Sequence, residues 1–196
     1  MNTELTVSAR SLASALLKAF AVILFFHMVV VFSHIGMHWR MSAFTVLFDM
    51  DLEANLPVFF NCALFFVLAA TCWLAGRTET ELRKGWFLLM LVFTFLGIDE
   101  GSQIHERFML WTQRLMNPNA PGTDMGFLHY AWVIPYLAGG LIVLLALLRF
   151  LLKLPASTRN GLLVSGVIYV TGAALMEMVS GKIARPLEGE PSAEAL

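Results

Sequence analysis

The sequence predicts an all-α membrane protein, a polytopic bundle of about five transmembrane helices. Of its 196 residues, 58% are hydrophobic and only 14% are charged, and the mean hydropathy is +0.73. Soluble domains have about 25% charged residues, so this composition indicates an integral membrane protein. Five apolar runs are about as long as the roughly 20 residues that cross a bilayer core, or longer. They extend approximately from Leu12 to Ile35, Pro57 to Ala75, Gly85 to Trp111, Phe127 to Leu154 and Gly161 to Ser180.

The first two runs are interpreted as membrane helices from their length. The first is longer than the apolar part of a secretion signal, and no small-residue cleavage site follows it, so we expect it to be retained. The second contains both cysteines, Cys62 and Cys72. Ten helical residues cover about 15 Å, too far for a disulfide within one helix. Both thiols are therefore interpreted as small buried groups, with a metal thiolate as the alternative, although no CxxC spacing supports it.

Each of the three later runs contains a residue or segment that is unusual in an apolar helix. The third ends in residues 99–106, with the sequence Asp-Glu-Gly-Ser-Gln-Ile-His-Glu. Pro135 lies inside the fourth, where it removes a backbone donor and is expected to bend the helix. Glu177 is a lone carboxylate in the otherwise apolar fifth. Between the first two runs, Phe44 to Leu56 combines apolar residues with three acids and is expected to form an interfacial or re-entrant segment.

The distribution of Lys and Arg predicts the orientation in the membrane. Eight of these residues fall on the side of the amino terminus and five on the opposite side, which places the amino terminus in the cytoplasm by the positive-inside rule. The eight are Arg10, Lys18, Arg77, Arg83, Lys84, Arg149, Lys153 and Arg159. The same topology places the carboxyl terminus outside.

Composition also limits the domain organisation and the partners. Residues 1–185 are predicted to form a single transmembrane helical domain, and residues 186–196 a short, acidic, disordered tail. The formal net charge is -1, so no basic field would attract nucleic acid. Membrane lipid is the expected partner, and a membrane protein partner is possible on the Gly139-Gly140 packing face.

Most ionisable groups near membrane depth gather at the predicted outer side. His34 and His38 close the first run, residues 99–106 end the third, His129 begins the fourth, and Glu177 lies near the end of the fifth. His27, about two turns deeper, is the main exception. Burying a charged or polar side chain in hydrocarbon without a partner is costly, so such groups usually face the interior of a bundle and mark a site or a structural pair.

Helical periodicity predicts one polar face at the end of the third run. At 100° per residue, Asp99, Ser102 and Glu106 share a stripe, and His105 stands beside Ser102. Such a face must meet other polar groups or water. These residues are therefore the central candidates for a functional site.

The chemistry of these side chains favours a metal site. Carboxylates and imidazoles are ligands of zinc, iron, manganese and copper, and zinc or iron is the expected divalent transition metal ion. Two histidines at i and i+4 lie on one helix face and can bind one ion. The predicted ligands are Asp99, His105, Glu106, His34 and His38. Glu100 and Glu177 are the predicted catalytic residues, as general base or further ligand.

Structural explanations compete with this interpretation. Residues 99–106 can form a polar helix end with internal ion pairs, for instance Glu100 or Glu106 with Arg107 or Arg114. Glu177 can equally pair with Arg107. The two histidines at the end of the first run can bond to backbone or to lipid headgroups.

The segment from Phe95 to Phe108 resembles the DExxxxHE signature of a group of small bacterial multi-pass membrane proteins of unassigned function. The sequence Trp-Val-Ile-Pro at residues 132–135 and the carboxylate of Glu177 also resemble that group. The resemblance implies a location in the bacterial inner membrane. A fainter likeness is to the ceramidase and adiponectin-receptor superfamily of intramembrane metal hydrolases, from which this chain differs in having about five helices where seven are expected.

The sequence therefore predicts a membrane protein with a carboxylate and histidine metal site near the outer leaflet. Our hypothesis is a metal-dependent enzyme that acts on a lipid-like or other apolar substrate. One alternative is a non-catalytic subunit or assembly factor of a membrane complex. The other is a transporter in which the same acids handle protons or cations, although no inverted repeat is evident.

Overall fold

Most of the described part of the chain is helical. The computed structural model describes residues 8–37, 42–116, 130–176 and 178–179, and no strand occurs within those ranges. This confirms the all-α prediction. The chain forms two compact units, residues 1–102 and 103–196, which we describe separately. The predicted tail, residues 186–196, lies outside the described residues, as do His38, His129 and Glu177.

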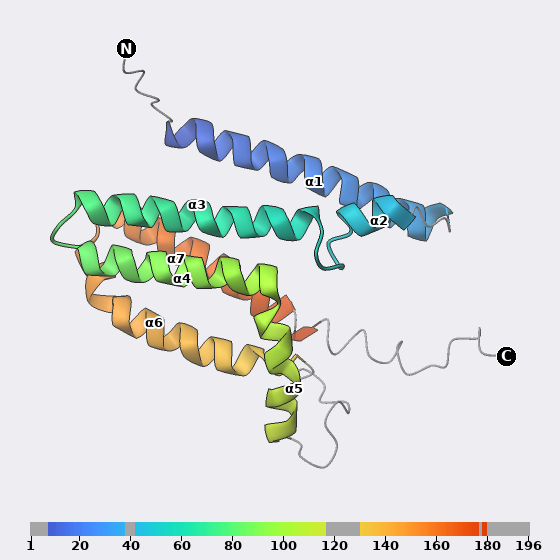
Figure 1. The fold of residues 1–196 in the computed structure, drawn as a ribbon. Coiled ribbons are helices and arrows are strands. Elements are labelled where there is room, and N and C mark those ends of the chain that lie inside the picture. Colours follow the sequence, from blue (N-terminus) through green and yellow to red (C-terminus); the bar gives the residue numbers. More distant parts are fainter. Residues whose placement is uncertain (1–7, 38–41, 117–129, 177, 180–196) are drawn as a thin grey trace. The chain divides into compact units, whose positions relative to one another are not determined.

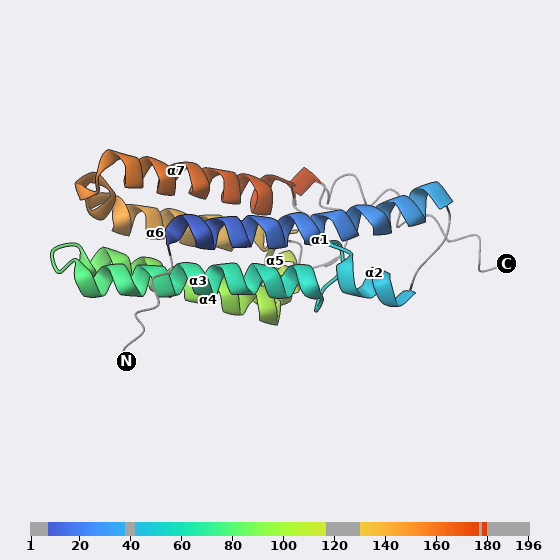
Figure 2. The same ribbon diagram turned by 90° about the horizontal axis from the view of Figure 1, so that it is seen from above.

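The first unit contains an antiparallel pair of long helices with a third helix beside it. Helices α3 and α4 lie side by side, and α1 runs along α3 (Figure 1; Figure 2). The short helix α2 contacts both α1 and α3. The bounds are Ala9–Met37 for α1, Ser42–Phe48 for α2, Leu56–Thr78 for α3 and Arg83–Ser102 for α4.

The second unit contains the remaining helices. Helix α5 covers Ile104–Met116, α6 covers Val133–Lys153 and α7 covers Ala156–Val170. A π-helical segment, η2, continues α7 over Thr171–Met176. Among the described residues, five helices are long and apolar enough to cross a membrane: α1, α3, α4, α6, and α7 extended by η2. This agrees with the five runs predicted from hydropathy.

The third predicted run is interrupted, which differs from the expectation of one helix to Trp111. Helix α4 ends at Ser102 and α5 begins at Ile104, because Gln103 adopts a left-handed conformation with φ of 55°. A left-handed residue directly after a helix is a common way to end it. The residues that follow are amphipathic and charged, so they do not continue an apolar span.

Two expectations for the fourth and fifth runs also change. Pro135 is the third residue of α6, where its missing N–H would have no partner within the helix, so it interrupts no helical hydrogen bond there. Helix α7 begins at Ala156, directly after Pro155 and five residues before the predicted start. The prediction from hydropathy omitted its first turn because the residues of that turn are mostly polar.

Glycines allow α3 and α4 to approach closely. A Cβ atom on Gly76 would lie 2.7 Å from a ring carbon of Phe87, and one on Gly97 would lie 3.2 Å from Cβ of Phe65. Gly76 and Gly97 are both buried. Small residues at such contacts permit the close backbone packing that stabilises helix pairs in membranes. This packing fixes how the polar end of α4 faces α3.

We expect Gly76→Leu to destabilise the protein by about 1–3 kcal/mol, because the added side chain must displace Phe87. The matched control is Gly140→Leu on α6, where an added Cβ would meet no atom within 4 Å. Thermal unfolding in detergent, followed by circular dichroism, measures both. Equal unfolding temperatures for the two variants would show that the α3 and α4 contact does not depend on Gly76.

Candidate functional site

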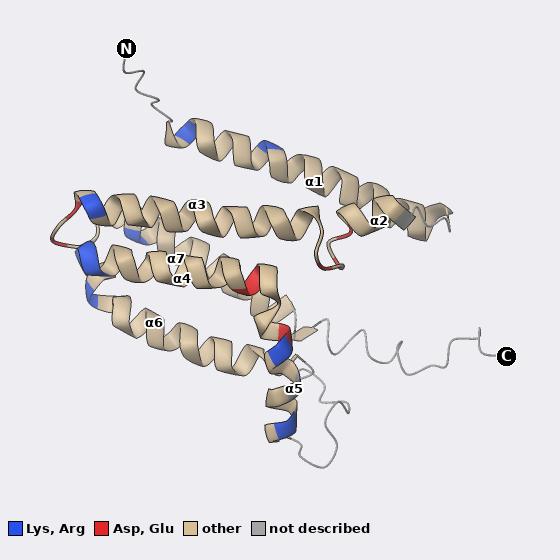
Figure 3. Ribbon diagram, viewed as in Figure 1, with Lys and Arg blue, Asp and Glu red and all other residues tan. Residues whose placement is uncertain are grey.

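Two adjacent carboxylates lie in the last turn of α4. Asp99 is 6% exposed and Glu100 is partly buried. The carboxyl end of a helix carries partial negative charge from its unpaired carbonyl groups, so acidic side chains there are unfavourable by about 0.3–1 kcal/mol each. Figure 3 shows the acidic residues of α4 at this end and the basic residues at the opposite end. The arrangement concentrates negative charge at one end of the helix.

Helix α3 contributes a polar side chain to the same place. Asn61 donates a hydrogen bond from Nδ2 to Oε1 of Glu100, at 2.9 Å. The neighbouring Cys62 lies against α4, because a Cβ atom on Gly101 would be 3.3 Å from its Sγ atom. Sequence reasoning treated Cys62 as a packing residue and did not identify Asn61. The available signal was an amide within an apolar span, where polar groups usually have a partner.

His105 and Glu106 lie in the first turn of α5, after the turn at Gln103. The predicted stripe through Asp99, Ser102 and Glu106 required one continuous helix. Because the left-handed residue ends α4, the positions before and after it do not follow one helical repeat. Glu106 is exposed and lies near the amino terminus of α5, where a carboxylate is favourable. The structure therefore divides the predicted motif between the end of one helix and the start of the next.

The His105 ring lies among aromatic residues of the second unit. Its centroid is 5.0 Å from that of Trp132 and 6.4 Å from that of Tyr136, and the two aromatic rings meet edge to face. Trp132 belongs to a buried cluster with Val133 and Ala174. This packing restricts the orientation of the imidazole, which favours a positioned ligand or proton acceptor over a freely rotating surface histidine.

The structure places His34 near the end of α1, with an unsatisfied imidazole nitrogen. Its Nε2 atom is buried and has no hydrogen-bond partner among the described residues, and the same holds for Oγ1 of Thr45 on α2. An unpaired buried polar group costs about 1–3 kcal/mol, so such a nitrogen is a candidate to bind an ion, a water or a ligand. The donor type fits a transition metal ion.

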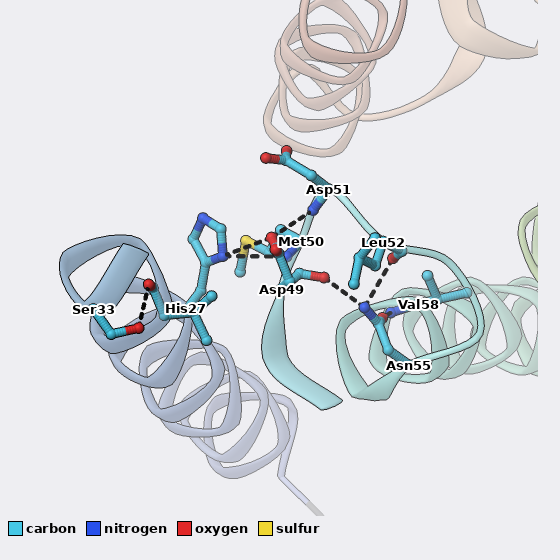
Figure 4. Close-up of polar contacts among 9 residues, drawn as sticks. His27, Ser33, Asp49, Met50, Asp51, Leu52, Asn55 and Val58 are labelled. Carbon is cyan, nitrogen blue, oxygen red and sulfur yellow. Dashed lines mark hydrogen bonds and ion pairs between the residues drawn. The ribbon is translucent and has the colours of Figure 1, made fainter. Parts of the chain in front are cut away.

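His27 holds the segment between α2 and α3 against α1. Its Nδ1 atom accepts a hydrogen bond from the backbone N–H of Met50 at 3.1 Å and lies 3.7 Å from Oδ1 of Asp49 (Figure 4). The neighbouring Phe26 ring packs on those of Phe44 and Phe48. These contacts position α2, and with it Thr45, beside α1.

Asn55 fixes the other end of this connection. Its side chain donates to the carbonyl oxygens of Asp49 and Leu52 and accepts from the N–H of Val58, which caps α3 (Figure 4). Asn55 is 3% exposed, and Ala54 before it has a positive φ of 56°. A single buried amide therefore organises the turn that leads into α3.

The predicted ligands do not form a complete metal site within the described ranges. No group of three or more His, Cys, Asp or Glu side chains in those ranges is arranged to hold an ion. The structure brings Glu100 together with Asn61 and Cys62 in the first unit and orients His105 in the second. His38 and Glu177 lie outside the described residues, although the π-helical segment η2 directly precedes Glu177 in the sequence. Segments of π-helix are frequent at functional sites.

A family model described as Domain of unknown function (DUF8692) matches residues 14–195. No curated protein and no solved structure matches the chain. The family match includes residues 99–106 and each predicted ligand and catalytic residue.

Proposed function

Since the chain belongs to the family Domain of unknown function (DUF8692), we propose its function from its own residues. We propose that it is a multi-pass membrane protein that binds a divalent transition metal ion, zinc or iron, near one end of its helices. The proposed ligands include Asp99, His105 and Glu106, with Glu100 or Glu177 as general base or further ligand. The substrate would be lipid-like or otherwise apolar.

The buried carboxylate of Asp99 is the observation that carries this proposal. It lies in the last turn of α4, beside Glu100 and next to the carbonyl groups that end the helix. Negative charge is unfavourable there for three reasons: burial, the helix dipole and the neighbouring acid. A bound cation would offset all three of these unfavourable effects.

Further ligands are supported by separate observations. The buried and unsatisfied Nε2 of His34 has the chemistry of an imidazole ligand. His105 and Glu106 follow Asp99 after six and seven residues along the chain. When bound, such an ion would supply Lewis-acid activation of water or of a carbonyl group. The Asn61 hydrogen bond would hold Glu100 in one orientation, as outer hydrogen bonds do for ligating carboxylates.

The proposed location is the bacterial inner membrane, with the amino terminus in the cytoplasm and the site near the outer leaflet. The distribution of charge in each unit supports this orientation. Arg77, Arg83 and Lys84 lie where α3 is followed by α4, and Lys153 lies where α6 is followed by α7 (Figure 3). Both connections fall on the same predicted side of the membrane. The positive-inside rule places connections rich in Lys and Arg on the cytoplasmic side.

A second candidate function is that of a non-catalytic subunit of a membrane complex. The apolar span formed by α7 and η2 has no buried residue in its most apolar window. A Cβ atom on Gly161, Gly166 or Gly172 would meet no atom within 4 Å. Unfilled glycines on an exposed membrane helix are suited to packing against another helix.

Elemental analysis of the purified protein tests the metal proposal. We expect wild-type protein to carry a stoichiometric metal ion, and Glu106→Gln and His105→Ala to reduce metal affinity at least about tenfold. Glu106 is exposed, so its variant should fold normally. Glu81→Gln, in the connection between α3 and α4, is the control and should keep the metal.

Folded variants that retain the wild-type metal content would refute the ligand assignment. A folded wild-type protein that takes up no metal when supplied with zinc or iron would instead favour the subunit function.

A further inference from the structure

An apolar groove lies between α1, α2 and α3 of the first unit. Its volume is about 640 Å³, which is within the range of small-molecule sites, about 300–1,000 Å³. One lining residue, Lys18, is charged, and the others are apolar.

The helical repeat explains how these residues form one groove. On α1 the lining positions are 18, 19, 22, 23 and 26, which follow the spacing of a single helix face. On α3 they are 56, 59 and 60, on one face of its first turns. The ring of Phe48 on α2 lies 4.6 Å from that of Phe26 and lines the groove with it.

A second hollow lies next to the first groove, between α1 and α3. It has a volume of about 270 Å³, is lined by apolar residues of α1 and α3, and shares Phe60 with the first groove. Helix α1 therefore leaves space along its contact with α3, in contrast to the close contact between α3 and α4 at Gly76 and Gly97. Side chains within a membrane have lipid as their solvent, so such a space suits an acyl chain.

Lys18 gives the groove a charged end. Its side chain is exposed, and it makes no hydrogen bond or ion pair with the described residues. It lies nine residues, about 14 Å, from the start of α1, and that helix of 29 residues exceeds the apolar core by about the same length. A lysine in this position can extend its ammonium to the lipid headgroups. An anionic headgroup would stabilise the charge, which is unfavourable in apolar surroundings without an anion.

We propose that this groove binds one membrane lipid, with an acyl chain between α1 and α3 and an anionic phosphate headgroup on the ammonium of Lys18. The charge of Lys18 selects an anionic lipid over a zwitterionic one. Under the proposed orientation Lys18 is on the cytoplasmic side, where the leaflet is rich in anionic lipids. The inference uses no metal ligand and does not depend on the metal proposal.

Native mass spectrometry of the full chain, released from vesicles of equal phosphatidylglycerol and phosphatidylcholine with identical acyl chains, tests this site. We expect the wild type to retain phosphatidylglycerol in preference to phosphatidylcholine, and Lys18→Gln to reduce that preference about fivefold. Lys18→Arg should keep it. Ala19→Phe fills the groove and should lower retention of both lipids several-fold, whereas Ala21→Phe, on the same helix outside the groove, should not.

The double variant separates a bound lipid from general attraction to an anionic surface. If headgroup and acyl chain belong to one lipid, Lys18→Gln does not reduce the preference for phosphatidylglycerol any further in the Ala19→Phe background. The same fivefold loss in both backgrounds, or equal retention by Ala19→Phe and Ala21→Phe, would overturn the proposal. Circular dichroism and size-exclusion chromatography verify folding, and Ala19→Leu provides a smaller filling substitution. Metal content should be unchanged in Lys18→Gln, so the two proposals can fail independently.

Discussion

The Asp99→Asn protein is expected to fold with nearly the wild-type stability and to bind metal at least about tenfold more weakly. Asparagine has the same shape as aspartate and keeps an acceptor oxygen, so buried hydrogen bonding can be preserved. Loss of the negative charge at the carboxyl end of α4 removes an unfavourable interaction of about 0.3–1 kcal/mol. A residue retained for function at the expense of stability behaves in this way. Thermal unfolding and metal titration on the same preparation measure both effects.

The control for this variant is Asp51→Asn. Asp51 is an exposed acid in the connection between α2 and α3, and its side chain makes no hydrogen bond with the described residues. It should change neither stability nor metal affinity. If Asp99→Asn instead unfolds the protein while Asp51→Asn does not, the buried carboxylate is a structural group, and the main support for the metal proposal is lost.

The Asn55→Ala protein is expected to lose about 3 kcal/mol of stability. The substitution removes the cap of α3, worth about 1 kcal/mol, and leaves two carbonyl oxygens without the donor that Asn55 provides. We also expect faster hydrogen exchange over residues 49–58, because the amide joins both parts of this connection. Urea or thermal unfolding, together with exchange measured by mass spectrometry, tests both effects.

Asn160→Ala is the matched control, since Asn160 is exposed on α7 and makes no hydrogen bond with the described residues. Its effect should be within about 0.5 kcal/mol. Equal losses from the two variants would contradict the role assigned to the buried amide.

The membrane helices could be predicted because hydropathy over some 20 residues is a strong signal. The left-handed turn at Gln103 could not. The preceding residues, Gly101 and Ser102, lie inside α4, and glutamine rarely adopts a positive φ, so no residue in this stretch indicated a helix end. The consequence was a polar stripe predicted across two helices that do not share one register.

The candidate site was predictable in part. The acids of residues 99–106 were identified because charge inside an apolar run is conspicuous. The Asn61 and Glu100 hydrogen bond was missed because it depends on how α3 packs against α4, which spacing along one helix does not specify. The contact between His27 and the backbone of Met50 is of the same kind, joining residues 23 positions apart.

X-ray absorption spectroscopy of the purified protein loaded with zinc is the most direct test of the proposed metal centre. The proposal predicts an inner coordination shell of oxygen and nitrogen atoms at about 2.0–2.2 Å, with an imidazole contribution that His105→Ala weakens. A sulfur scatterer at about 2.3 Å would assign the metal to a cysteine, and a fully hydrated ion would show adventitious binding. Either result would contradict a carboxylate and histidine site.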